Sequence, residues 1–297
     1  MITPLATTTV ATTAAVFHVV RETQRLLRLE QFTPLTDDRL PPLSLIVAAR
    51  DEGKSIGPAL NSILNLEYPV LEVVLVDDRS SDDTVAIARS IQEFHPRGER
   101  LRLIENRELP DGWLGKVHAQ HLGVTSARHP LILLTDADVV FSRDALKRAV
   151  SAQQMLGADH LAVLPRLVTK GFWEPAVAAY LEWLVVILFR PSSLHRSRYR
   201  FVGVGAFALL TRDILSRVEW MEPLRLQVID DGYLGLMVKA RRGRQYLLVG
   251  RDDLSLRWFT GLTGFLKGLE KNAYAAVGYS FPLALVTALA ISAPFWS

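Results

Sequence analysis

Short apolar runs recur between Leu43 and Leu164, and stretches with the spacing of amphipathic helices separate them. Short runs without polar residues predict strands that are covered on both faces, whereas apolar residues spaced three and four apart predict helices. The expected strands are 43–49, 71–76, 101–104, 131–134 and 161–164, and the expected helices are 56–64, 84–94, 116–127 and 145–155. This alternation predicts right-handed βαβ units. The predicted fold class is therefore α/β, with a doubly wound, mostly parallel sheet and flanking helices.

The chain before this alternation divides into two parts. Residues 1–20 carry no charged side chain, and Arg21, Arg25 and Arg28 follow at once. This pattern fits a marginal transmembrane helix with a cytoplasmic positive flank, and it fits a peripheral amphipathic helix equally well. Residues 1–29 are therefore expected to form an N-terminal hydrophobic helix that could anchor the chain. The segment 30–42 is rich in Pro and Asp and is predicted to be a linker.

Apolar segments return after the alternating part. The segment 171–189 is expected to be an interfacial helix or a buried core helix, and the basic tract 190–200 follows it. Residues 258–271 are amphipathic and are expected to lie at an interface. Residues 272–297 carry no charge and are long enough to span a bilayer. Because basic residues precede this segment, domain 43–257 is predicted to face the cytoplasm at the cell membrane.

Composition strengthens the membrane prediction and excludes several chemistries. Of the 297 residues 49% are hydrophobic, and the mean hydropathy of +0.18 is high for a soluble protein. The net charge of +3 is only mildly basic, and no nucleic-acid partner is expected. There is no cysteine, which excludes disulfides, thiolate catalysis and cysteine-based zinc sites. A GxGxxG loop and a Walker A sequence are also absent, so neither a dinucleotide cofactor nor P-loop chemistry is indicated.

Carboxylates cluster where three of the expected strands end. The pairs are Asp51–Glu52 after the first strand, Asp77–Asp78 at the end of the second, and Asp136 with Asp138 at the end of the fourth. In a doubly wound sheet the carboxyl ends of the strands face one crevice, where ligands bind. A crevice lined by carboxylates suits a hard divalent ion, Mg²⁺ or Mn²⁺, that carries a phosphate ligand. Basic residues near these strand ends can pair with phosphate oxygens, namely Arg50, Arg79 and Lys116.

A further carboxylate pair, Asp230–Asp231, lies beyond the predicted sheet. It could supply a general base, and it could equally cap a helix. His118 and His121 lie three residues apart, but no third ligand is apparent, so a structural role is expected for both. The pair Arg257–Trp258 could place an aromatic anchor beside a phosphate-pairing arginine, or it could belong to an interface.

Six motifs together carry a family resemblance. They are Val47–Glu52, Val76–Thr84, Gly115–Lys116, Thr135–Asp138, Ile229–Asp231 and Arg257–Trp258. In this order they resemble the motifs of glycosyltransferase family 2, from about Leu43 to Lys271. The segment Gly112–Lys116 and the hydrophobic C-terminus are similar to the membrane-associated branch that includes ceramide glucosyltransferases and hopanoid-associated glycosyltransferases.

The resemblance implies a GT-A fold, and an inverting transfer from a nucleotide-diphosphate sugar donor to a lipid or lipid-linked acceptor. It implies that Asp136 and Asp138 form the DxD motif and hold Mg²⁺ or Mn²⁺, and that Asp231 is the catalytic base. The implied nucleotide-sugar-binding residues are Ala49, Arg50, Asp51, Glu52, Asp78, Lys116, Asp136, Ala137, Asp138, Asp230, Arg257 and Trp258. The family's QxxRW motif has Leu254 in place of Gln here. A polysaccharide synthase and a non-catalytic membrane scaffold with a decayed transferase domain remain as alternatives.

Overall fold

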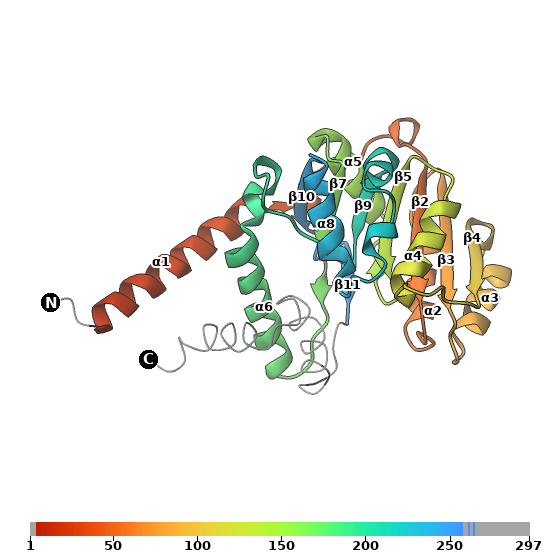
Figure 1. Cartoon of the computed structure of the whole chain (residues 1–297), viewed down its shortest axis with the longest axis horizontal. Helices are drawn as coiled ribbons and strands as arrows, with labels where there is room; N and C mark the ends of the chain where they lie inside the picture. Colours follow the sequence, from red (N-terminus) through yellow and green to blue (C-terminus); the bar gives the residue numbers. More distant parts are fainter. Residues whose placement is uncertain (1–3, 258–260, 262–263, 265–297) are drawn as a thin grey trace.

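The computed structural model describes residues 4–257 together with 261 and 264, and its centre is a twisted sheet (Figure 1). Within this described part the sheet has eight strands in the order β1-β10-β7-β9-β5-β2-β3-β4. The strands are β1 (Leu27–Arg28), β2 (Leu43–Ala49), β3 (Leu71–Asp78), β4 (Leu101–Asn106), β5 (Leu131–Asp136), β7 (His160–Leu164), β9 (Ala208–Thr211) and β10 (Gln245–Val249). Strand β9 runs antiparallel to β5 and β7, and the other pairs are parallel. The mostly parallel sheet is confirmed.

A smaller sheet lies beside the main one, with its strands in the order β6-β11-β8. Its strands are β6 (Val140–Phe141), β8 (Arg166–Leu167) and β11 (Leu254–Leu256). The helices are α1 (Pro4–Arg25), α2 (Ile56–Leu64), α3 (Thr84–Phe94), α4 (Gly115–Ser126), α5 (Ala145–Leu156), α6 (Trp173–Phe189), α7 (Arg212–Arg217) and α8 (Asp230–Ala240). Short 3₁₀ turns occur at Leu29–Gln31, Asp37–Arg39, Gly98–Arg100, Pro191–Arg196 and Glu222–Leu224.

Helices cover both faces of the sheet, which explains why its strands carry so few polar residues. Along β2, the side chains of Leu45 and Val47 join a core with apolar residues of α2 and α5. The intervening Ile46 joins a second core with residues of α4, α7 and α8. Alternate residues of one strand therefore fill opposite cores, as the side-chain period of a strand requires.

The segment expected to be a linker, 30–42, belongs to the folded body. Phe32 and Leu40 are buried in the core that contains α2 and α5. Just before it, β1 pairs with β10 at the edge of the sheet. Prolines and aspartates suggested a linker, but the few apolar side chains between them bury enough surface to hold the segment against the sheet.

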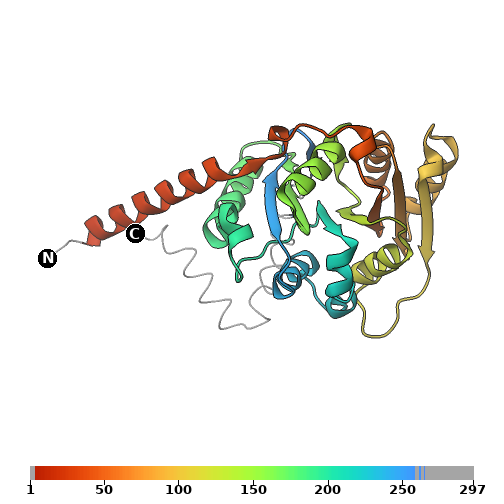
Figure 2. The ribbon, with the colours of Figure 1, turned by 90° about the horizontal axis from the view of Figure 1, so that it is seen from above.

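Helix α1 projects from the body beside α6 (Figures 1 and 2). The expected helix over 171–189 is present as α6, with Ala178 and Val186 buried and Trp173 exposed. Among the residues that the structure describes, α1 included, no helix is long and apolar enough to cross a membrane. The expected segments 258–271 (apart from 261 and 264) and 272–297 lie outside the described residues.

Candidate active site

The ends of β5, β2 and β3 lie side by side and bring the predicted carboxylates together. Ala48 of β2 pairs with Asp136 of β5, and Ala49 pairs with Asp77 of β3. Ala49 and Ala137 are buried, with 2% and 3% of their surface exposed, so the backbone is the part of each that can contribute to a ligand site. The predicted meeting of three strand ends is confirmed.

Asp78 is already paired with cations in this structure. Its Oδ1 lies 2.9 Å from Arg79 Nε, and its Oδ2 lies 3.1 Å from Arg79 Nη2. Asn106 Nδ2 donates to Asp78 Oδ1 at 3.2 Å, and Arg50 Nη1 lies 3.9 Å from Oδ2. A Cβ on Gly115, at the start of α4, would lie 2.0 Å from Asp78 Oδ2. The absence of a side chain at Gly115 therefore lets the helix approach this buried ion pair.

Two loops are joined at the ends of β2 and β3. Ser81 donates to Asp51 Oδ1 from its backbone N at 2.7 Å and from its Oγ at 3.0 Å. These two bonds lower the pKa of Asp51 below its usual range. In the other direction, Glu52 N donates to Thr84 Oγ1 at 2.8 Å and Gly53 N donates to Asp82 Oδ2 at 2.8 Å. These hydrogen bonds join the two loops, and no local pattern in the sequence predicts them.

Lys116 is the cation between two carboxylates that are far apart in the sequence. Its Nζ lies 2.8 Å from Asp136 Oδ1 and 3.6 Å from Asp230 Oδ2. Gln120, one turn further along α4, donates from Nε2 to Asp230 Oδ2 at 3.0 Å. Burial alone would lower the pKa of Lys116, but the carboxylates of Asp136, Asp230 and Asp231 outweigh burial and raise it. Lys116 is therefore charged throughout the physiological range and serves as the counter-ion of this cluster.

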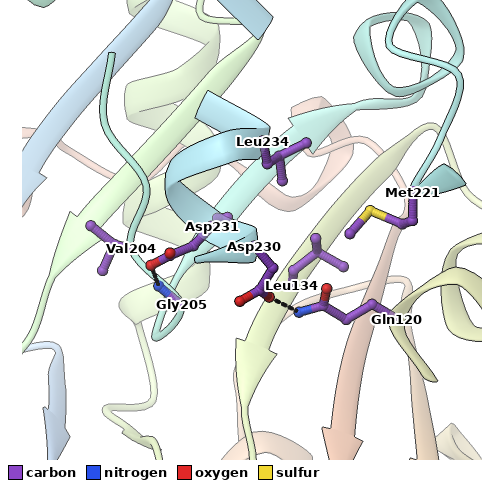
Figure 3. A pocket seen from close by; sticks show the side chains of 9 residues that line it. Gln120, Leu134, Val204, Gly205, Met221, Asp230, Asp231 and Leu234 are labelled. Carbon is purple, nitrogen blue, oxygen red and sulfur yellow. Dashed lines mark hydrogen bonds between the residues drawn. The ribbon is translucent and has the colours of Figure 1, made fainter. Parts of the chain in front are cut away.

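Asp231 lies in the first turn of α8 and is held by backbone N–H groups. Gly205 N donates to its Oδ2 at 2.9 Å (Figure 3), and Gly232 N donates to its Oδ1 at 2.7 Å. Burial raises the pKa of Asp231, and the neighbouring Asp230 raises it further. The N-cap of α8 is Ile229, so neither aspartate occupies the cap position that the sequence left open. A carboxylate whose pKa is raised is better suited to accept a proton.

A small pocket opens beside these two aspartates (Figure 3). It encloses about 260 Å³ of space, which includes open solvent. Its walls are mainly apolar, and its polar side is formed by Asp230, Asp231 and Gln120. The lining residues are Gln120, Leu134, Val204, Gly205, Ala208, Met221, Asp230, Asp231 and Leu234. The pocket thus combines an apolar wall with the carboxylate that could act as a base.

Asp136 and Asp138 have the chemistry of a partial metal site. Burial, together with the negative charges of Asp136 and Glu52, raises the pKa of Asp138 to about 6. The two residues therefore concentrate negative charge on hard oxygen donors, which suits Mg²⁺ or Mn²⁺. Within the described ranges no three metal-ligating side chains surround one point. The residues fit an ion that takes its other ligands from phosphate oxygens and water.

Arg257 pairs with an acidic residue that the sequence analysis assigned no role. Its Nη2 lies 3.2 Å from Glu174 Oε1 at the start of α6. The same carboxylate accepts a hydrogen bond from Gly261 N at 2.8 Å and another from Lys170 N at 2.5 Å. Ser255 of β11 pairs with Val140, two residues after Asp138, which brings this part of the chain toward the DxD motif. Trp258 lies outside the described residues.

The imidazoles of His118 and His121 take part in packing. Both rings lie against Trp113, with centroid separations of 5.4 and 4.9 Å. His118 Nδ1 also lies 3.2 Å from Asn106 Nδ2, behind Asp78. The structural role expected for this pair agrees with these contacts.

Comparison with known proteins supports the motif analysis. The chain is 33% identical over 174 residues to 4,4'-diaponeurosporenoate glycosyltransferase of Staphylococcus aureus (strains MRSA252 and USA300). That alignment covers 58% of this chain and 44% of the relative, so the chain spans less than half the length of these curated relatives.

Solved structures share the fold. A mannosyltransferase from Pyrobaculum calidifontis, in complex with GDP-Man and Mn²⁺, superposes with a TM-score of 0.65 at 21% identity. That match covers 95% of this chain and 74% of the mannosyltransferase. Staphylococcus aureus TarS 1–349 in complex with UDP-GlcNAc matches with a TM-score of 0.53 at 17% identity, covering 80% of this chain and 66% of TarS. The fold is therefore GT-A. The model of "Glycosyl transferase family 2" matches residues 44–218, and the chain belongs to this family.

Proposed function

We propose that the protein is a metal-dependent, inverting glycosyltransferase that acts at a membrane surface. It transfers a sugar from a nucleotide-diphosphate sugar to a hydroxyl of a lipid or lipid-linked acceptor. One observation carries this proposal. Lys116 bridges Asp136, at the end of β5, and Asp230, at the start of α8, with Asp231 next to it. The predicted donor-binding carboxylates and the predicted base thereby share one charged cluster.

The sugar is transferred in a single displacement, in which the residues of the site have separate roles. The acceptor hydroxyl oxygen forms a bond to the anomeric carbon while the bond from that carbon to the β-phosphate oxygen breaks. The proton of the hydroxyl passes to Asp231, and the electron pair of the broken bond remains on the nucleoside diphosphate. Attack from the face opposite the leaving group inverts the anomeric centre. The bonds from Gly205 and Gly232 orient the Asp231 carboxylate before the acceptor arrives.

Charge on the leaving diphosphate needs positive partners. Lys116 can donate to phosphate oxygens, and Arg50 and Arg79 lie at the neighbouring strand ends. A bound Mg²⁺ or Mn²⁺ held by Asp136 and Asp138 would neutralise the charge that develops on the diphosphate. The mannosyltransferase that shares this fold was solved with GDP-Man and Mn²⁺, which supports a divalent ion and a nucleotide-diphosphate sugar here.

The acceptor class rests on two observations. The relative from Staphylococcus aureus is named for diaponeurosporenoate, and this chain matches it over 174 residues. The pocket beside Asp231 has apolar walls formed by Leu134, Val204, Met221 and Leu234. Together they favour an acceptor whose reacting oxygen lies next to apolar structure.

Membrane association is proposed through α1 and α6, on the cytoplasmic side of the cell membrane. Exposed apolar side chains occur on α1 and at the start of α6, namely Val16, Phe17, Val20, Phe172 and Trp173. Exposed arginines lie at the ends of these helices, namely Arg21, Arg25 and Arg28 at and after the end of α1, and Arg190, Arg196 and Arg198 after α6. Apolar side chains beside basic ones suit the interface of a membrane that contains anionic lipids.

A donor-binding experiment tests the core of the proposal. Purified protein in lipid is titrated with a panel of UDP- and GDP-sugars in Mn²⁺, in Mg²⁺ and in EDTA, and release of the nucleotide is followed. Binding and release that need the metal and disappear in Asp136→Ala are expected. Asp213→Asn is the matched control, because this carboxylate lies on the exposed surface of α7 and pairs only with Arg217 in the described part of the chain. If no sugar nucleotide binds to the unaltered protein, the proposal is wrong and a scaffold role becomes the better hypothesis.

The acceptor and the orientation need separate measurements. Membranes containing the protein are incubated with the labelled donor, and lipids are extracted into an organic solvent. Label that enters the organic phase only when Asp231 is intact would establish a lipid acceptor. Because the chain has no cysteine, Asp213→Cys can be labelled with an impermeant maleimide. Labelling only after the cells are opened is expected for a cytoplasmic domain.

A further inference from the structure

A buried glutamine holds the segment Val202–Gly205 from the side opposite to the carboxylates of the site. Gln245 is the first residue of β10 and has 0% of its surface exposed. Its Oε1 accepts from Val202 N at 3.1 Å, and its Nε2 donates to Val202 O at 2.7 Å. One side chain thus satisfies both backbone polar groups of Val202, much as a neighbouring strand would.

His160 is the partner of the second N–H of the Gln245 side-chain amide. It lies opposite Gln245 on β7, and its Nδ1 is 2.7 Å from Gln245 Nε2. Burial, together with the positive charge of Lys239, lowers the pKa of His160 to about 3. The ring is therefore neutral, and Nδ1 accepts the hydrogen bond. Turning the amide over would place its oxygen against two acceptors, so its orientation is determined.

Val202–Gly205 is packed backbone to backbone against α8. A Cβ on Gly235 would lie 2.0 Å from Val202 O, and a Cβ on Gly203 would lie 2.0 Å from the carbonyl carbon and oxygen of Asp231. At the far end, Gly205 N donates to Asp231 Oδ2, and a Cβ on Gly205 would lie 2.8 Å from Asp136 Oδ2. These close contacts leave no room for Val202 to move alone, so a displacement of Val202 is transmitted to Gly205.

We propose that Gln245 is a positioning residue for the transfer reaction. Supported by His160, it fixes Val202 and thereby holds Gly205 N–H against the Asp231 carboxylate, next to Asp136. Gln245 touches neither substrate nor metal, and it acts through Val202–Gly205. The inference rests on the role of Asp231 that is set out under the proposed function.

Gln245→Met tests this role. Methionine keeps the length of the side chain and removes all three hydrogen bonds. We expect kcat for nucleotide release to fall about 10- to 100-fold, because the base loses its fixed orientation. The donor KM and the affinity for the free nucleoside diphosphate should stay within about twofold, since the donor carboxylates lie on other elements. His160→Leu removes one bond of the three and should lower kcat about two- to threefold.

Gln153→Met is the matched control. Gln153 in α5 is also buried, with 3% exposed, and its amide has no hydrogen-bond partner among the described residues. This variant changes the same buried group away from the site and should leave kcat and KM unchanged. Thermal unfolding is recorded for every variant, and His160→Leu carries the test if Gln245→Met does not fold.

The outcomes separate the two proposals. A loss of kcat in Gln245→Met with retained nucleotide affinity, and no loss in Gln153→Met, supports the positioning role. Equal kcat in both methionine variants, or a parallel loss of nucleotide affinity and Tm, shows that Gln245 only supports the fold. Absence of sugar-nucleotide binding by the unaltered protein would overturn the proposed function itself, before any variant is compared.

Discussion

The two sides of the candidate active site differ in how their charges are balanced. On the loop side, Asp51 and Asp78 lie beside Arg50 and Arg79, and Ser81 and Asn106 complete their hydrogen bonds. On the lysine side, Lys116 is the cation for four carboxylates, Asp136, Asp138, Asp230 and Asp231. On the loop side Asp51 and Asp78 thus each have a neighbouring arginine, whereas on the lysine side one lysine faces four carboxylates.

This difference suggests how the site works. The carboxylates of the loop side are held by neighbours within the protein, so this side presents a fixed surface to a nucleotide. Under the proposed function, the excess negative charge of the lysine side would bind a divalent cation and accept a proton. Burial is the main cause of the raised pKa values of Asp138 and Asp231, and the neighbouring carboxylates contribute to both. The predictions below therefore contrast equivalent changes on the two sides.

The largest effect is expected for Asp231→Asn. The amide keeps the shape of the carboxylate but cannot accept the acceptor proton, so kcat should fall about 10²- to 10⁴-fold. Donor affinity should change little, because Asp231 lies across the cluster from the strand ends. Steady-state kinetics together with calorimetric titration of the donor measures both quantities. Loss of donor binding along with activity would contradict the assignment of Asp231 as the base.

Arg79→Met and Lys116→Met compare one cation from each side. Arg79 neutralises the buried Asp78, so its removal should lower the free energy of unfolding by up to about 3 kcal/mol. Removing Lys116 leaves the negative charges of the donor complex in place and removes a cation that pairs with phosphate oxygens. Donor affinity should then fall about 10- to 100-fold.

Denaturant unfolding and donor titration of both variants measure this contrast. Lys116→Arg is the control that keeps the charge and should recover much of the affinity. The comparison of the two sides fails if Arg79→Met loses as much donor affinity as Lys116→Met does.

The pH dependence of metal binding should expose the excess charge directly. The pKa of Asp138 is raised to about 6 in the metal-free protein, so Mn²⁺ must displace a proton below that pH. Apparent Mn²⁺ affinity should fall about tenfold for each pH unit below 6 and level off above it.

The sign of the stability effect is opposite for the metal-free protein. Because the folded pKa exceeds the unfolded one, stability should decrease as the pH rises from about 4 to about 6. Asp138→Asn should remove both dependences. Mn²⁺ binding and thermal unfolding measured between pH 4.5 and 8 test them, and a flat Mn²⁺ profile would mean that Asp138 is not a ligand.

The sequence predicted the parts of this site that follow from chain order. Strand ends can be located from apolar runs, so the meeting of Asp51, Asp78 and Asp136 followed from the predicted sheet. The position of β9 between β5 and β7 was not predicted, because a short antiparallel insertion leaves no periodic signal. The burial of segment 30–42 was not predicted for the same reason. Phe32 and Leu40 are isolated apolar residues in a polar segment and give no periodic signal.

Contacts between residues that lie far apart in the chain could also not be predicted from the sequence. Glu174 with Arg257, and Gln245 with Val202, join residues that lie far apart in the chain. Each pair consists of common residue types in unremarkable local patterns. Glu174 merely interrupted an apolar helix, and nothing near Gln245 marked it as buried. Side-chain partners of this kind are chosen by the packing of the completed fold.

The smallest effect is expected for Asp51→Asn on the loop side. Asn keeps an oxygen that can accept the hydrogen bonds from Ser81, and Asp51 is exposed to solvent. The donor KM should rise no more than about threefold, and kcat should not change. Because those hydrogen bonds lower the pKa of Asp51, it is ionised throughout the assay range, and the variant should keep the pH profile of the unaltered protein. A fall in kcat or a shifted profile would mean that the loop side also takes part in the chemical step, and that charge balance does not divide the site into a binding side and a reacting side.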